Sequence, residues 1–241
     1  MIELETGQAP QYSVIWMHGL GADGSDFEPI VPYLGLNPSV PVRFVFPNAL
    51  QIPVTCNGGY VMPAWYDIIS LAADSREIDE AGLLASRDAI AGLIEREVAR
   101  GIPADRIFLA GFSQGGAVAY LTGLSHKEPL AGIIALSTYI PSPSQAVQLA
   151  TQASRSTPIY IAHGTHDDVV SLKLGEIARD TIAELGYTFD WQTYPIGHEV
   201  CLPLTLSDVL YVLRYIGKIL NGFVKVVQPH RTEVNNRRRR P

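Results

Sequence analysis

The sequence predicts an α/β fold in which a mostly parallel sheet carries helices on both of its faces. Short apolar runs rich in β-branched residues alternate with segments whose apolar residues recur at helical spacing. The apolar runs are nearly continuous, as expected of strands buried on both sides in a parallel sheet. No internal repeat and no dividing linker interrupts this alternation, which is typical of α/β domains.

The first half of the chain contains two predicted strands and one long helix. The stretches "YSVIWMH" (Tyr12–His18) and "VRFVFP" (Val42–Pro47) predict the strands. Residues 48–80 show no clear periodicity, and a long irregular segment in such a domain often forms a wall of a binding site. The stretch "EAGLLASRDAIAGLIEREVARG" then predicts a helix that stops at Gly101.

The second half continues the alternation. We expect strands at Ile107–Ala110, Gly132–Thr138 and Pro158–Gly164, an outer strand over "YTFDWQTYP", and helices after Ser113, over Leu172–Glu184 and over about Leu206–Leu220. In sheets of this kind, ligands bind at the carboxyl ends of the strands. Residues with catalytic chemistry are therefore expected just after strands.

Length and composition fit one compact domain. The chain has 241 residues, 47% hydrophobic and 17% charged, and we assign residues 1–222 to a single domain and 223–241 to a flexible basic C-terminal tail. There is no apolar run of 18 residues and no basic-then-apolar N-terminus, so neither a membrane span nor a secretory signal is expected. Cys56 and Cys201 are too few for a disulfide scaffold or a metal knuckle, and we expect free thiols in the cytoplasm.

Charge is distributed unevenly along the chain. The net charge is −6; residues 231–241 hold five Arg and one Glu, a charge of +4, so the rest carries −10. This acidic body argues against a nucleic-acid surface. The tail "NNRRRRP" predicts either a solvated terminus or a tether to anionic lipid or nucleic acid.

A serine bracketed by glycines stands at a predicted strand-to-helix junction. In "IFLAGFSQGGAVAYLTG" the apolar start is a strand, and Gly111 and Gly115 flank Ser113 at two residues on either side. Such glycines keep side chains out of a sharp turn that would expose a nucleophilic hydroxyl. The following helix would point its first N–H groups at the same place, which suits an oxyanion. The alternative is an ordinary junction in which Ser113 only caps the helix.

A serine nucleophile needs a base, and the base needs an acid that fixes its tautomer. His198 lies in "YPIGHEV", beyond the outer strand, and Asp167 and Asp168 follow the strand that ends near Ala162. The resulting order Ser–Asp–His is the one expected of α/β-hydrolases. The residues alone leave open which aspartate is the acid.

These segments also allow two other interpretations, a metal site and a nucleotide loop. His163, His166, Asp167 and Asp168 could suggest a metal site, but adjacent residues rarely converge on one ion without helical or hairpin spacing. The turn "HGLGADG" could suggest a nucleotide loop, but no helix opens directly after it and no lysine follows. We prefer a turn whose backbone N–H stabilises an oxyanion together with the N–H of Gln114.

Five ordered motifs give the chain a specific resemblance. "HGLGADGSDF", "NGGYVMPAWYD", "GFSQGGAVA", "HGTHDDVV" and "YPIGHEV" resemble the carboxylesterase, lysophospholipase and acyl-protein thioesterase family of small α/β-hydrolases, from about Tyr12 to Leu220. The "NGG…WYD" segment resembles its bacterial carboxylesterase branch. Cys56 and Cys201 beside two motifs, the less acidic stretch after His198 and the arginine-ended tail depart from the family pattern.

The resemblance implies a role for individual residues. It assigns the nucleophile to Ser113, the acid to Asp167 and the base to His198. It also implies oxyanion N–H groups at Leu20 and Gln114. The resemblance further implies that the segment around Trp65 runs near the site, with Trp65 as a substrate-binding pocket wall.

These expectations combine into one functional prediction. The chain should be a serine hydrolase that cleaves carboxylic esters through an acyl-enzyme on Ser113, with no cofactor and no metal. The alternatives are an acyl-protein thioesterase or lysophospholipase using the same three residues, and an inactive binding protein on a hydrolase fold. The expected partners are an ester or thioester substrate, for which a lysophospholipid is one candidate, and a second copy of the chain in a homodimer.

Overall fold

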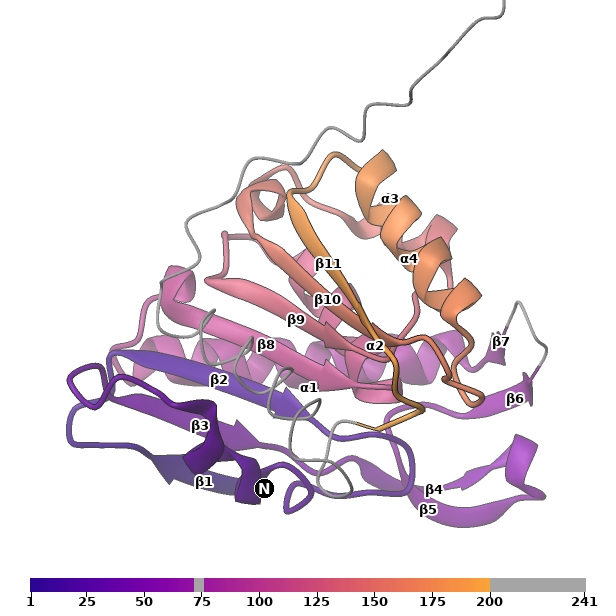
Figure 1. Ribbon diagram of the computed structural model, residues 1–241, viewed down its shortest axis with the longest axis horizontal. Coiled ribbons are helices and arrows are strands. Elements are labelled where there is room, and N and C mark those ends of the chain that lie inside the picture. The colour runs from indigo at the N-terminus through magenta and orange to yellow at the C-terminus, as the bar shows by residue number, and fades with distance from the viewer. Residues whose placement is uncertain (72–75, 200–241) are drawn as a thin grey trace, which may run out of the picture.

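The computed structural model describes residues 1–71 and 76–199. The helix expected at about Leu206–Leu220, the basic tail and Cys201 lie outside the described residues. Within them, a seven-stranded sheet in the order β1-β3-β2-β8-β9-β10-β11 forms the centre of the molecule (Figure 1). Its strands are β1 (Ile2–Glu5), β2 (Tyr12–Met17), β3 (Val42–Phe46), β8 (Ile107–Phe112), β9 (Gly132–Leu136), β10 (Ile159–Gly164) and β11 (Phe189–Tyr194).

The sheet is parallel except at one edge. Among the described strands of this sheet, only β1 runs antiparallel to its neighbour, β3; the other neighbouring pairs are parallel. The expected parallel α/β sheet is therefore confirmed. The carboxyl ends of the parallel strands all lie at the same end of the sheet, called here its carboxyl edge. The segments after β2, β8, β10 and β11 come together there (Figure 1).

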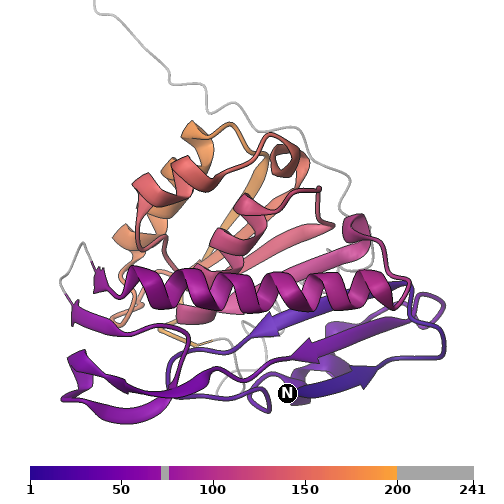
Figure 2. The same cartoon turned by 180° about the vertical axis from the view of Figure 1, so that it is seen from behind.

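Helices were expected on both faces of this sheet, but the α-helices within the described residues all pack on one face. They are α1 (Glu80–Ala99), α2 (Gln114–Ser125), α3 (Pro143–Leu149) and α4 (Leu172–Glu184). Each helix contributes to a single buried cluster, with Ile90, Ala117, Ala146 and Ile182 as one member from each. Figure 2 shows this face, with the long helix α1 crossing in front of the strands.

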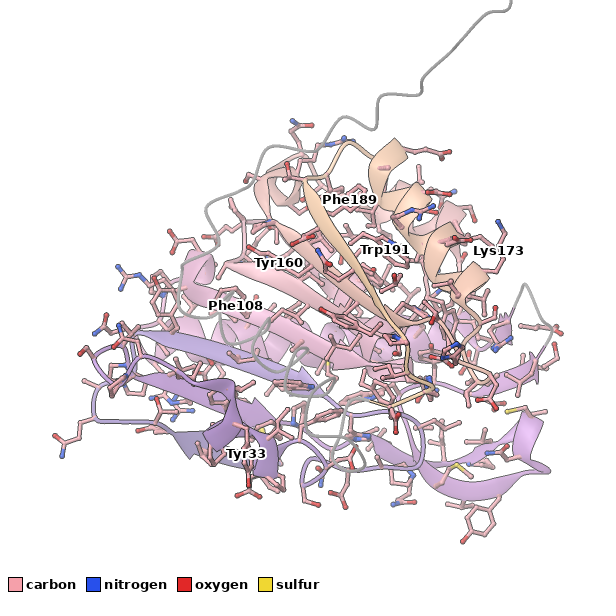
Figure 3. The ribbon with its side chains drawn as sticks, viewed as in Figure 1. Tyr33, Phe108, Tyr160, Lys173, Phe189 and Trp191 are labelled. Carbon is pink, nitrogen blue, oxygen red and sulfur yellow. The ribbon has the colours of Figure 1, made fainter. Side chains whose placement is uncertain are left out.

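A second buried cluster lies on the opposite face. In the described part of the chain, that face is covered by the 3₁₀ segment η1 (Glu28–Leu34), whose Ile30 and Leu34 pack against the strands. Figure 3 labels Phe108 of β8 and Tyr160 of β10, both members of this cluster or packed against it. Both rings would contact a Cβ at Gly132, so this glycine lets them close together over β9.

Helix α1 begins and ends for local reasons that the sequence shows. Asp79 caps α1 by accepting a hydrogen bond from Ala81 N, and Gly101 follows the helix with a φ of +95°. A residue with positive φ ends a helix most easily when it is glycine. The expected stop of this helix at Gly101 agrees with the structure.

Residues 48–80 are more regular than the sequence suggests. They contain the hairpin of β4 (Leu50–Val54) and β5 (Tyr60–Ala64), and the paired strands β6 (Ile68–Leu71) and β7 (Arg76–Ile78). Both ribbons lie at the carboxyl edge of the sheet (Figure 1). None of the described helices is long and apolar enough to span a bilayer.

Candidate active site

Ser113 occupies a strained turn between β8 and α2. Its φ of 52° and ψ of −120° are unusual for a residue with a side chain. A Cβ on Gly111 would lie 2.3 Å from Gly115 O, and a Cβ on Gly115 would lie 2.5 Å from His18 O. Only glycine fits at either position, so the bracketing glycines make the sharp turn possible.

Hydrogen bonds from the neighbouring strand hold this strained residue. Ser113 N donates to Leu136 O at 3.0 Å, at the end of β9. Thr138 Oγ1 donates to Ser113 O at 2.6 Å. The Ser113 backbone is thus fixed on both sides, and its side chain is left to make contacts at the carboxyl edge of the sheet.

The structure brings Ser113, His198 and Asp167 together in a line. His198 Nε2 lies 3.0 Å from Ser113 Oγ, and His198 Nδ1 lies 2.8 Å from Asp167 Oδ2. The three residues follow β8, β11 and β10, which belong to the run of neighbouring parallel strands β8-β9-β10-β11. A base between a hydroxyl and a carboxylate is the arrangement that activates a serine nucleophile.

Asp167 and Asp168 have different environments. Asp167 is 7% exposed, and its Oδ1 accepts hydrogen bonds from Val169 N and Val170 N at 3.0 and 2.8 Å. Its Oδ2 is thereby aimed at His198. Asp168 is exposed, and the residue at the cap of α4 is Ser171. The geometry therefore selects Asp167 as the partner of His198.

His163 is buried beside Asp167. Its Nε2 lies 2.9 Å from Val170 O and 3.7 Å from Asp167 Oδ2. Burial is the main reason that the pKa of His163 is lowered from its ordinary value. The described residues contain no group of three or more His, Cys, Asp or Glu side chains that could hold a metal ion, and His166 is exposed.

The turn after β2 lies against Ser113. A Cβ on Gly19 would meet the Phe112 ring at 3.1 Å and Ser113 Cβ at 3.6 Å. Leu20, half-buried in this turn, packs against the main core cluster. Gln114 N is the first amide of α2 and has no intrahelical acceptor. Residues 19–27 form turns before the 3₁₀ segment η1, so no α-helix opens there to bind phosphate.

His18 organises this turn from inside. Its Nε2 accepts a hydrogen bond from Ala49 N at 3.0 Å, so the ring proton must be on Nδ1, which donates to Gly19 O at 2.7 Å. Burial is the main cause that lowers the pKa of His18. His18 is therefore neutral and acts as part of the scaffold.

Trp65, the predicted pocket wall, is buried and makes internal hydrogen bonds. It is 6% exposed, and its indole Nε1 donates to His18 O at 2.9 Å. Its backbone N donates to the side-chain Oε1 of Gln114 at 2.9 Å. Trp65 thus lies next to the candidate site, as expected, but its recorded hydrogen bonds are to the protein itself.

Phe112 contacts His198, and the sequence did not reveal this contact. Its ring lies 4.7 Å from the His198 ring, centroid to centroid, and it also meets Phe27 edge-on at 6.0 Å. The only available signal was its place next to Ser113 in the glycine-bracketed motif. Phe112 therefore limits the positions that the imidazole of His198 can adopt.

Comparison with known proteins shows the family to which the chain belongs. Residues 3–215 match the Phospholipase/Carboxylesterase family. Acyl-protein thioesterase 1 of Neurospora crassa is 42% identical over 198 residues, which cover 79% of this chain and 81% of that protein. The Carboxylesterase SOBER1 of Arabidopsis thaliana is 31% identical over 211 residues, covering 87% of this chain and 91% of the relative.

A solved structure supports the same assignment. The crystal structure of Arabidopsis thaliana SOBER1 superposes with a TM-score of 0.77 at 30% identity, covering 87% of this chain and 99% of that one. These relatives are fungal and plant proteins, so the expected placement in a bacterial branch is not supported. The chain belongs to the Phospholipase/Carboxylesterase family of α/β-hydrolases.

Proposed function

We propose that this hydrolase cleaves carboxylic esters through an acyl-enzyme on Ser113. The observation that carries the proposal is the alignment of Asp167, His198 and Ser113, with contacts of 2.8 and 3.0 Å. His198 accepts the Ser113 proton as Oγ attacks the ester carbonyl. Asp167 holds the tautomer in which Nδ1 is protonated and stabilises the imidazolium that forms.

The negative charge on the carbonyl oxygen needs donors at the place where it develops. We assign this role to the backbone N–H groups of Leu20 and Gln114, one from the turn after β2 and one from the start of α2. Such donors are commonly the largest single contribution to acyl-transfer catalysis, at about 10²–10³ in rate for each. The positive end of the α2 dipole adds to the same effect.

The tetrahedral intermediate then collapses. His198 gives its proton to the leaving oxygen, the alcohol departs, and Ser113 carries the acyl group. Water attacks this acyl-enzyme with His198 again acting as base, and the free acid leaves. Every proton in this sequence moves between substrate, water, Ser113 and His198, so the steps require no cofactor.

A thioester substrate is the second candidate. Several of the similar proteins carry the name acyl-protein thioesterase 1, among them those of Neurospora crassa and Mycosarcoma maydis. The same nucleophile and oxyanion donors serve a thioester, because attack on the carbonyl carbon is common to both. A lysophospholipid is a third possible ester of this type.

The surroundings of the site favour an ester whose acyl chain is apolar over one whose acyl chain is charged. Residues 47–66, which include the β4–β5 hairpin, hold no charged residue. Pro63 O accepts a hydrogen bond from Gly21 N at 2.9 Å, so this uncharged segment lies against the oxyanion turn. Apolar surface at this place suits the fatty chain of an ester or thioester.

A substrate panel tests these assignments. The chain is assayed with p-nitrophenyl esters from acetyl to palmitoyl, a palmitoylated peptide thioester and lysophosphatidylcholine, with Ser113→Ala as the control. We expect hydrolysis of the p-nitrophenyl esters that is lost in Ser113→Ala. A kcat/KM for the thioester above that for every oxygen ester would make thioester hydrolysis the main activity, and no turnover of any substrate would contradict the proposal.

A cytoplasmic location and a homodimer are further proposals. The low cysteine content supports a reducing compartment, and Cys56 is a free thiol in the structure. Size-exclusion chromatography with light scattering tests the dimer, and a monomeric mass would contradict it.

A further inference from the structure

Every hydrogen-bonding group of Trp65 is engaged. The backbone N donates to Gln114 Oε1, the indole Nε1 donates to His18 O, and the backbone carbonyl accepts a bond from Ser86 Oγ of α1. The first two bonds are both 2.9 Å long and buried. Trp65 is therefore tied at once to the start of α2, to the turn after β2 and to α1.

The side chain of Gln114 completes the link to the nucleophile. Its Oε1 accepts from Trp65 N, and its Nε2 donates to Tyr66 O at 2.7 Å. Because one end of the amide meets a donor and the other meets an acceptor, its orientation follows from its partners. The same residue carries the first backbone N–H of α2, directly after Ser113.

The turn that contains Leu20 is held at two points by one segment. His18 O accepts from the Trp65 indole, and Gly21 N donates to Pro63 O at 2.9 Å. These two bonds flank Leu20 on either side. The segment from Pro63 to Tyr66 therefore bonds to both places that provide an oxyanion donor.

We propose that Trp65 and the Gln114 side chain are positioning residues for the oxyanion hole. They fix the Leu20 and Gln114 N–H groups relative to each other, so that both donors meet the same oxygen in the transition state. This inference rests on the proposed function, because it requires an oxyanion at Ser113. It assigns to Trp65 the control of donor geometry, on which oxyanion stabilisation depends.

A residue that only filled the core would affect stability and leave catalysis intact. A residue that positions the oxyanion donors affects the transition state more than the bound ester, because the charge exists only in the transition state. The two roles therefore differ in how kcat and KM respond to a change at Trp65.

Trp65→Phe removes the indole N–H and keeps an aromatic ring beside His18. In the wild type the centroids of the Trp65 and His18 rings are 5.1 Å apart. With p-nitrophenyl butyrate we expect kcat to fall by about 10- to 100-fold while KM stays within about twofold. The inhibition constant of a trifluoromethyl ketone, which forms a tetrahedral adduct on serine, should rise by the same factor as kcat falls. A folded Trp65→Phe variant with kcat within about twofold of wild type would overturn the proposal.

Trp16→Phe is the matched control. Trp16 is fully buried, lies in the cluster on the opposite face of the sheet, and its indole N–H has no hydrogen-bond partner within the described residues. We expect this variant to lower Tm and leave kcat unchanged. An equal loss of kcat in both variants would mean general weakening of the core and would also overturn the proposal.

Two further measurements keep the test decisive. If Trp65→Phe does not fold, Gln114→Met removes both side-chain bonds from the other end while keeping the backbone N–H, and the same kcat and KM criteria apply. A fluorophosphonate probe is also used on the wild type. Absence of label on Ser113 would refute the proposed function, whereas label on Ser113 with unchanged kcat in the folded variants refutes only the positioning role.

Discussion

Asp167 reaches His198 because its other carboxylate oxygen is tied to its own turn. Oδ1 accepts from the amides of Val169 and Val170, and Oδ2 lies 2.8 Å from His198 Nδ1. The turn bonds hold the carboxylate independently of His198, so Asp167 is oriented by residues that follow it in the chain. Asp168, one residue later, has no equivalent place in this arrangement and is exposed.

Replacing the two aspartates separately tests this difference. Asp167→Asn should lower kcat by orders of magnitude, about 10⁴ in the serine-protease precedent, because an amide can hold the wrong tautomer of His198. Asp168→Asn is a surface change of the same size and should leave kcat nearly unchanged. Both variants are assayed with one ester at one pH, and a crippled Asp168→Asn enzyme would refute the assignment.

Glycines at the turn and in a helix should respond in opposite ways to alanine. Gly115→Ala places a Cβ 2.5 Å from Met17 O and His18 O, so the turn that carries the oxyanion donor must move. We expect at least a hundredfold loss of kcat/KM, on the order of removing one donor. Wild-type kcat/KM in a folded Gly115→Ala variant would show that the close approach is not required.

Gly92→Ala provides the matched comparison. Gly92 is exposed in the interior of α1, and a Cβ there would meet nothing within 4 Å. Alanine should raise the free energy of unfolding by about 0.5–1 kcal/mol through helix propensity. Urea denaturation measures this change, and kcat/KM should stay at the wild-type value. A destabilised Gly92→Ala variant would contradict the expected open environment.

Stability should fall as the solution becomes mildly acidic. Burial lowers the pKa of both His18 and His163 from the ordinary value of 6.5. Below that value the unfolded chain binds protons that the folded chain does not, so unfolding becomes more favourable as pH falls. We expect a lower Tm at pH 5.5 than at pH 7.5, measured by thermal unfolding at constant ionic strength.

A variant identifies the contribution of one histidine. His163→Gln keeps a donor for Val170 O and removes one of the two groups with a lowered pKa, so the difference in Tm between the two pH values should shrink. An unchanged difference would exclude His163 as a source, and equal Tm values in the wild type at both pH values would contradict the pH prediction itself.

Much of the fold was predictable because its strongest signals are local. The strands of the parallel sheet are short and apolar, and Gly111 and Gly115 mark the turn at Ser113. The order of Ser113, Asp167 and His198 could be found because each follows a predicted strand. Their approach to within 2.8 and 3.0 Å depends on the order of strands in the sheet, which the sequence did not specify.

Other features depend on contacts between distant segments. β1 (Ile2–Glu5) alternates apolar and acidic residues over only four positions, and it pairs with β3 about forty residues later. The β4–β5 hairpin contains Pro53 and Pro63, which weaken a strand prediction. The internal bonds of Trp65 could not be predicted either, because they join its segment to three others that are distant in the chain.

Covalent labelling of Ser113 tests the central claim most directly. The wild type and Ser113→Ala are incubated with a fluorophosphonate, digested and analysed by peptide mass spectrometry, and ester hydrolysis is measured in parallel. We predict one adduct per chain, on Ser113, with complete loss of hydrolysis, and neither adduct nor hydrolysis in Ser113→Ala. An adduct on another residue, or wild-type hydrolysis by a folded Ser113→Ala variant, would contradict the account.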